Sequence, residues 1–415
     1  MVEKRTLSNG IRLVYEHIPY VRSVSLGIWI GNGSRHEKAS EGGASHFIEH
    51  MLFKGTKTYT AAGLAELCDR IGGMINAYTT KDCTCLYGRV LDTQLLTLSD
   101  MFLDMLENSN FSEDDVISER SVILDEISMC SDTPDDLVYE RLVAGIYKGS
   151  SLSRPILGKK STLDKMTGES LKSFMASHYD PKNIVIAISG NFNVSDIDSI
   201  AESFSVMRGN SVKYKKAVYS PYFTVKRRNL EQNHLFVAYP GIPSEDKRKY
   251  AFTLLGNIAG GNASSRLFQS VREKYGLCYN ICTAVSAFPD TGIFGIYTAL
   301  SEEAEDKALS VITDEIRKIK DGDITQDELD LSIELVRSGI LMSLESTGSR
   351  MNRLGRNELY LGYIPSVEEV IAGYERVTLD DITALANEVF DTEQISFSAI
   401  GRVRSADEYK NVLIN

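Results

Sequence analysis

The sequence contains no long apolar run, no paired cysteine motif and no excess of positive charge. No stretch of the 415 residues approaches the roughly 18 consecutive apolar residues that a membrane-spanning helix needs. The first ten residues resemble a strand and a turn, without the apolar segment of a signal peptide or an arginine-rich presequence. We therefore expect a cytoplasmic or already processed protein with no membrane partner. The formal net charge of −12 argues against nucleic acid as a partner.

The cysteines give little evidence for disulfides or for a thiolate metal site. The chain has six of them, none in a CxxC pair: Cys68, Cys83, Cys85, Cys130, Cys278 and Cys282. Reduced thiols are the default for such a chain without an export signal. Cys83 and Cys85 could form a soft-metal pair, but a spacing of two in a strand also places both side chains on one face. We expect packed core thiols.

The segment His46-Phe47-Ile48-Glu49-His50 contains two metal-ligand side chains and a carboxylate within five residues. On a helix, His46 and His50 are one turn apart on the same face, where both imidazoles can bind one Zn²⁺. Glu49 stands beside them, where a general base can take a proton from a metal-bound water. The order is that of the inverted zinc-peptidase motif. The competing interpretation is an ordinary helix face with two solvent-facing histidines.

Two segments of the first half recur in the second half at an offset of about 211 residues. The alternating strand at 23–31 corresponds to 233–241, and the helix end, turn, strand and glycine at 179–190 correspond to 390–401. Helical patterns lie between these strands in both halves. The repeat predicts an α+β protein of two homologous domains, each a largely antiparallel sheet packed with helices.

The seam between the halves falls in the polar segment near residues 207–223, which gives domains at 1–210 and 211–415. At the offset, the positions of the first-half motif hold Asn257, Gly260 and Gly261. The second domain therefore lacks the ligands. We expect one Zn²⁺ per chain, in the first domain.

A third ligand must come from outside the motif, because catalytic zinc usually has three protein ligands and one open position. The predicted helix from Ser112 to Ser128 begins with a Ser-x-x-Asp capping pattern and contains Glu119 and Glu126, which lie two turns apart on nearly the same face. Either carboxylate could ligate while the other orients a ligand. A solvated acidic helix face is the alternative.

The segment from His46 to Thr56 closely resembles the active-site segment of the inverted-motif zinc peptidases, the family of pitrilysin, insulysin and the mitochondrial processing peptidase. The resemblance extends over the whole chain and is greatest to the bacterial processing-peptidase-like members. It implies that Glu126 is the third metal ligand and that Glu119 supports the site. It also implies a clamshell in which the two domains face each other around a chamber.

A second group of candidate residues lies in the second half. Arg272 and Tyr279 stand seven apart, at the end of a predicted amphipathic helix that also holds Arg266, and such a pair can hold a peptide carbonyl or a developing oxyanion. A surface arginine and a half-buried tyrosine are the alternative. The resemblance favours the active-site role, because the family carries this pair in its C-terminal half.

The segment 76–85 follows two glycines and is typical of a turn into an edge strand, to which an extended peptide can add as a further strand. Plain sheet is the alternative. The resemblance implies that Asn76 and Ala77 lie next to the scissile bond of the substrate.

Together these features predict a zinc-dependent endopeptidase that hydrolyses unfolded peptides in extended conformation, with Glu49 as its general base. The alternative is a non-catalytic scaffold or partner subunit of the same family. Because the chain carries both the zinc motif and the Arg/Tyr pair, we expect self-sufficient activity as a homodimer. The chain departs from the family pattern in the segment 41–45, which has an extra glycine before the motif, and at 151–158, which lacks the usual His-Pro.

Overall fold

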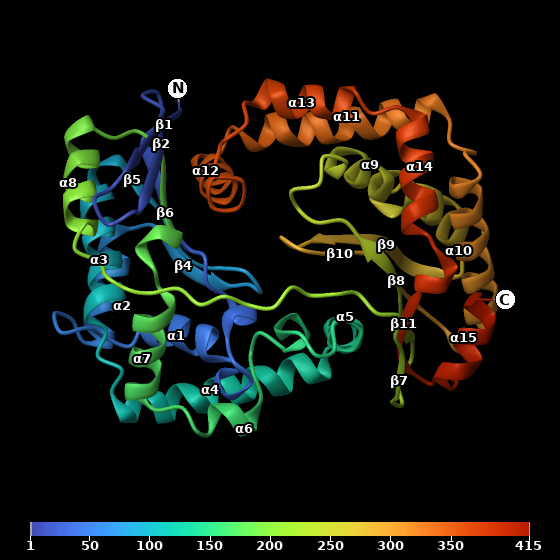
Figure 1. Ribbon diagram of the computed structural model, residues 1–415, viewed down its shortest axis with the longest axis horizontal. Helices are drawn as coiled ribbons and strands as arrows, with labels where there is room; N and C mark the ends of the chain where they lie inside the picture. Colours follow the sequence, from blue (N-terminus) through green and yellow to red (C-terminus); the bar gives the residue numbers. More distant parts are fainter. Residues whose placement is uncertain (1, 415) are drawn as a thin grey trace. The chain divides into compact units, whose positions relative to one another are not determined.

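The computed structural model describes residues 2–414 and divides into two compact units (Figure 1). Unit 1 comprises the described residues up to Ser128, together with Arg154–Lys215 and Leu341–Pro365. Unit 2 comprises Met129–Ser153, Lys216–Ile340 and the described residues from Ser366 onward. Each unit consists of one mixed β-sheet with helices on both faces, so the predicted α+β class with two sheet-plus-helix parts is confirmed.

The sheet of unit 1 has the strand order β1-β2-β6-β3-β5-β4, antiparallel except for the β2–β6 pair. Its strands are β1 (Val2–Thr6), β2 (Arg12–His17), β3 (Ser23–Ile30), β4 (Met74–Thr79), β5 (Thr84–Leu91) and β6 (Ile184–Gly190). The helices of this unit are α1 (Ala44–Leu52), α2 (Ala61–Ile71), α3 (Leu95–Asn108), α4 (Glu113–Asp132, which runs on into unit 2), α6 (Lys160–Leu163), α7 (Gly168–His178), α8 (Val194–Phe204) and α12 (Thr347–Leu361).

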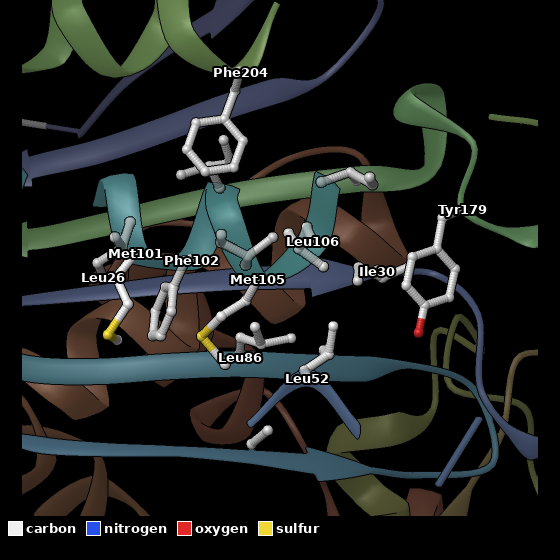
Figure 2. Packing of buried hydrophobic residues seen from close by; sticks show 14 of the residues in the cluster. Leu26, Ile30, Leu52, Leu86, Met101, Phe102, Met105, Leu106, Tyr179 and Phe204 are labelled. Atoms are coloured by element: carbon white, nitrogen blue, oxygen red, sulfur yellow. The ribbon is translucent and has the colours of Figure 1, made fainter. Parts of the chain in front are cut away.

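One face of this sheet packs on the helices of the N-terminal half. Figure 2 shows Phe102 and Met105 pointing from α3 toward the strand of Leu86, with Phe204 of α8 against another side of α3. These side chains are buried and belong to a core that also includes Leu52 of α1. The core therefore fixes α1 against the sheet.

The other face of the sheet is covered by α12, which comes from the C-terminal half of the sequence. All residues of β6 are buried, and successive residues enter different clusters: Ile186 joins the core just described, while Val185 packs with Met351 and Leu354 of α12. A strand that is apolar on both faces requires a cover on both faces. The helix α12 provides the second cover.

Unit 2 repeats the arrangement with the strand order β7-β11-β8-β10-β9, in which the β7–β11 pair is parallel. Its strands are β7 (Phe223–Arg227), β8 (Asn233–Gly241), β9 (Cys278–Ala287), β10 (Gly292–Leu300) and β11 (Ser396–Gly401). Its helices are α5 (Pro134–Ile146), α9 (Lys249–Gly260), the π-helix η6 (Phe268–Lys274), α10 (Glu305–Lys320), α11 (Gln326–Ser343, which runs on into unit 1), α13 (Val367–Glu375), α14 (Leu379–Val389) and α15 (Ala406–Ile414).

The helix α5 covers one face of the sheet of unit 2, as α12 does in unit 1. It belongs to the N-terminal half of the sequence, and its buried residues Val138, Leu142 and Ile146 pack with Phe236 of β8 and Ile400 of β11. The other face of that sheet forms a separate core with the C-terminal helices. The two halves of the chain thus exchange one helix each.

The strands that repeat in the sequence occupy equivalent places in the two sheets. β3 lies between β6 and β5, and its counterpart β8 lies between β11 and β10. The segment from residue 207 to 222 between α8 and β7 forms neither helix nor strand. It lies at the seam predicted from sequence, but the compact units differ from the contiguous ranges 1–210 and 211–415 by the exchanged segments.

Among the described residues, no helix is both long and apolar enough to cross a membrane. All six cysteines are free thiols, and each is buried or half-buried.

Candidate metal centre and substrate-contact residues

The helix α1 presents the two histidines of the motif on one face. It begins after Gly43, whose φ of 97° lies in the left-handed region that glycine tolerates, and buries Phe47, Ile48 and Met51 in the core. These apolar anchors fix the rotation of the helix. As a result, the His46 and His50 rings lie with their centroids 4.7 Å apart.

Glu126 of α4 completes a three-residue group with these histidines. Its Oε2 atom lies 3.7 Å from Nε2 of His46 and 3.7 Å from Nε2 of His50. One ligand atom of each residue lies within 4.8 Å of the others, and this is the one such group found among residues 2–414. A separation of 3.7 Å is too long for a hydrogen bond. It is close to the roughly 3.4 Å that two ligands about 2.05 Å from a tetrahedral Zn²⁺ would show.

The ionisation of His46 suits a metal site. His46 is buried, and burial together with the neighbouring His50 lowers the pKa of His46 to about 4. The imidazole is therefore neutral at pH 7, with a lone pair available to a cation. Two imidazoles and a carboxylate at these separations fit Zn²⁺.

Glu119 lies on the other side of His50. Its Oε2 atom is 3.1 Å from Nδ1 of His50, and its Oε1 atom is 2.6 Å from Nζ of Lys54. A carboxylate at Nδ1 fixes the tautomer that leaves Nε2 free to bind a metal. The spacing alone left Glu119 and Glu126 as alternative ligands, while the family resemblance implied Glu126. The structure places Glu126 near both Nε2 atoms and Glu119 at Nδ1 of His50.

Glu49 lies next to the three-residue group without belonging to it. The hydroxyl of Thr79, at the end of β4, donates a hydrogen bond to Oε2 of Glu49. Burial raises the pKa of Glu49, while the Thr79 hydrogen bond and the nearby His50 oppose the shift. A carboxylate with a raised pKa accepts a proton more readily than an exposed one.

The predicted edge strand is present only in the first part of the segment 76–85, because residues 80–83 form no strand and Thr84 begins the interior strand β5. β4 ends the strand order of unit 1 and pairs on one side with β5. Asn76 and Ala77 lie in its middle, and the side-chain oxygen of Asn76 accepts a hydrogen bond of 2.8 Å from the backbone N–H of Ala77. This donor of the strand is therefore already satisfied.

Arg272 and Tyr279 lie together in unit 2. The guanidinium carbon of Arg272 is 5.2 Å from the centre of the Tyr279 ring and 4.5 Å from that of Phe268. The Tyr279 side chain is exposed. Arg272 lies in a π-helical turn, a backbone form that is frequent at functional sites. Arg266, in contrast, makes two hydrogen bonds of 2.6 and 2.8 Å to Glu328.

The sequence interpretation missed three residues that support the motif. Lys54 and Thr79 stand in segments that it quoted, but their partners are distant in sequence, and no local pattern reveals them. Glu37 is the third: its carboxylate accepts hydrogen bonds from the backbone N–H groups of Gly43 and Ser45, at the start of α1.

Comparison with known proteins places the chain in a family. Residues 12–160 match the family model described as insulinase (peptidase family M16), and residues 165–336 match the one described as peptidase M16 inactive domain. An uncharacterized zinc protease of Bacillus subtilis is 38% identical over 402 residues, which cover 96% of this chain and 98% of the relative. The chain belongs to peptidase family M16. The predicted resemblance is thereby confirmed.

The chain is also similar to another curated relative and to two solved structures. An uncharacterized zinc protease of Streptomyces coelicolor is 36% identical over 415 residues, covering 97% of this chain and 90% of the relative. The crystal structure of a protease from Helicobacter pylori matches with a TM-score of 0.88 at 21% identity, over 97% of this chain and 99% of the other. An M16 inactive domain from Pseudomonas fluorescens gives 0.89 at 20% identity, with 98% of each chain covered. The two structures show the same fold.

Proposed function

We propose that this M16 chain is a zinc-dependent endopeptidase that hydrolyses unfolded peptides, with one Zn²⁺ held by His46, His50 and Glu126. The observation that supports this proposal is the convergence of three ligand atoms from α1 and α4, at separations that suit a shared ion and not a hydrogen bond. The names of the relatives, zinc proteases, agree with it.

The residues around the ligands have separate tasks in this proposal. When bound, Zn²⁺ would act as a Lewis acid that makes water more acidic and polarises a carbonyl. Glu49 accepts the proton of the attacking water at its carboxylate and returns a proton to the leaving amine nitrogen. Thr79 holds Oε2 of Glu49, which leaves Oε1 as the proton-accepting atom. Glu119 holds the His50 ring by its Nδ1 atom.

We further propose that four residues contact the substrate. The exposed edge of β4, at Asn76 and Ala77, would pair with an extended peptide, which favours backbone recognition over side-chain specificity. For a peptide to pair with the backbone N–H of Ala77, the hydrogen bond from this N–H to the Asn76 side chain must first break. Arg272 and Tyr279 would hold a peptide carbonyl or carboxylate through their guanidinium and phenol groups.

The competing function is that of a non-catalytic scaffold or partner subunit. The description of the second family model as an inactive domain is consistent with either function, because the metal-ligand group lies in the segment matched by the first model. The homodimer stays a prediction of the sequence resemblance.

The variant Glu49→Gln tests the proposal. We expect it to bind one equivalent of Zn²⁺ and to cleave a quenched fluorescent peptide about 10²–10⁴-fold more slowly, since the amide cannot accept the proton. Asp125→Asn is the matched control, because Asp125 is an exposed acid next to Glu126, and it should retain activity. Undiminished cleavage by Glu49→Gln would remove the mechanism, and wild-type protein with neither stoichiometric zinc nor cleavage would favour the scaffold.

A further inference from the structure

The start of α1 has no capping side chain of its own. The helix begins at Ala44, so the metal-ligand candidate His46 falls in its first turn, where backbone N–H groups lack partners within the helix. The residue before the helix is Gly43, which has no side chain to supply a hydrogen-bond acceptor. The turn that carries His46 must therefore be fixed by another part of the chain.

Glu37 supplies this cap. Its Oε2 atom accepts a hydrogen bond of 2.9 Å from the N–H of Gly43, and its Oε1 atom accepts one of 2.9 Å from the N–H of Ser45. The side chain is 3% exposed. A carboxylate that accepts two N–H groups at a helix N-terminus satisfies both donors and interacts favourably with the helix dipole. Glu37 thus holds the residue before His46 directly.

The cap is itself fixed from a distant segment. Arg154 donates a hydrogen bond to the backbone carbonyl of Glu37 and attracts its carboxylate electrostatically. Lys81 in turn donates to the backbone carbonyl of Arg154. The segment that follows Arg154 lies close to the start of α1. A Cβ added at Gly43 would lie 2.8 Å from the carbonyl oxygen of Leu157, so only glycine fits there.

We propose that Glu37 is a positioning residue of the metal centre, which acts through the first turn of α1 to hold His46 in the geometry that binds Zn²⁺. The inference rests on the proposed zinc site. No part of the Glu37 carboxylate belongs to the ligand group, so its effect on the metal passes through the backbone of α1.

The test compares Glu37→Gln with Glu41→Gln in the full-length protein. An amide offers one oxygen to two N–H donors and turns an NH₂ group toward one of them. Glu41 is the matched control, because it stands four residues later and its carboxylate bonds to Lys38, not to α1. Zn²⁺ affinity is measured by competition with a chromogenic chelator, and the thermal midpoint of the metal-free protein is recorded alongside.

We expect Glu37→Gln to weaken Zn²⁺ binding roughly 10-fold or more, as is typical of residues that orient a metal ligand, and Glu41→Gln to bind as the wild type does. At saturating zinc, kcat should fall while KM changes less than 2-fold. Glu37→Asp keeps the charge but is one methylene shorter, so we expect an intermediate loss of affinity. If Glu37→Gln does not fold, the zinc affinity of Glu37→Asp decides the test.

A lower thermal midpoint with unchanged zinc affinity would overturn the inference, because it would show a cap that only stabilises the fold. This outcome differs from failure of the proposed function, in which the wild-type protein itself would bind no stoichiometric zinc.

Discussion

At the scale of single residues, the candidate metal centre contains a buried carboxylate with a charged partner. Glu119 is 4% exposed and lies between His50 and Lys54. A buried carboxylate without partners would be costly, but here a cation and an imidazole N–H face its two oxygens. The Glu119 carboxylate thus joins Lys54 to His50, with one oxygen on each.

The burial of Glu37 predicts a pH dependence of stability. Burial raises its pKa from 4.5 to about 7, although the N–H groups of Gly43 and Ser45, the Ser45 hydroxyl and the charge of Arg154 all favour the anion. Between pH 4.5 and 7 the folded protein holds a proton that the unfolded chain releases. The free energy of unfolding contributed by this group should therefore be full below pH 4.5 and decline as the pH rises to 7.

The measurement uses metal-free protein, so that proton release on zinc binding does not interfere. The difference in thermal midpoint between wild type and Glu37→Gln should change in this window, with the wild type relatively less stable at pH 8 than at pH 4.5. A constant difference across the range would show that Glu37 titrates near its ordinary pKa.

At the scale of secondary-structure elements, the packing of α12 on the sheet depends on the absence of a side chain at Gly355. A Cβ at this position would overlap the ring of Trp29, which is fully buried. We expect Gly355→Ala to destabilise unit 1 by about 1–3 kcal/mol through overpacking. The fluorescence of Trp29, the one tryptophan of the chain, reports this transition.

Gly339→Ala is the control for this substitution. Gly339 lies inside α11 with open space around its Cβ position, so alanine there should stabilise the helix by about 0.5–1 kcal/mol. Thermal unfolding followed by circular dichroism covers both variants. Equal shifts in the two proteins would mean that helix propensity, and not contact with Trp29, controls position 355.

The sequence predicted the elements well where the pattern is local. The strand β3, the Ser112 cap of α4 and the equivalent places of β6 and β11 in the two sheets were predicted correctly. The burial of β3 does not alternate, because the strand is buried on both faces. The sequence could not predict that α5 packs on the sheet of the C-terminal half and α12 on the sheet of the N-terminal half. An amphipathic helix does not specify which sheet will cover its apolar face. The hydrogen bonds of Glu37 and Thr79 were missed for a similar reason: they join segments through the fold.

At the scale of the whole molecule, the exchange of helices makes each half of the chain incomplete. Residues up to the linker contain the sheet of unit 1 but not α12, and residues after it contain the sheet of unit 2 but not α5. A half without its exchanged helix would expose apolar side chains such as Trp29 or Phe236, which are buried in the intact protein. Both halves are therefore expected to need each other to fold.

A cut in the linker tests this dependence. A protease site inserted between Ser211 and Val212, in the segment without helix or strand, should allow complete cleavage of the chain. We expect the two fragments to co-elute in size-exclusion chromatography and to separate only in denaturant, because each still donates a buried helix to the other's sheet. Adding Gly355→Ala to the cut protein should lower the denaturant concentration at which they separate. Fragments that part under native conditions would show that the exchanged helices contribute too little apolar contact to hold the halves together.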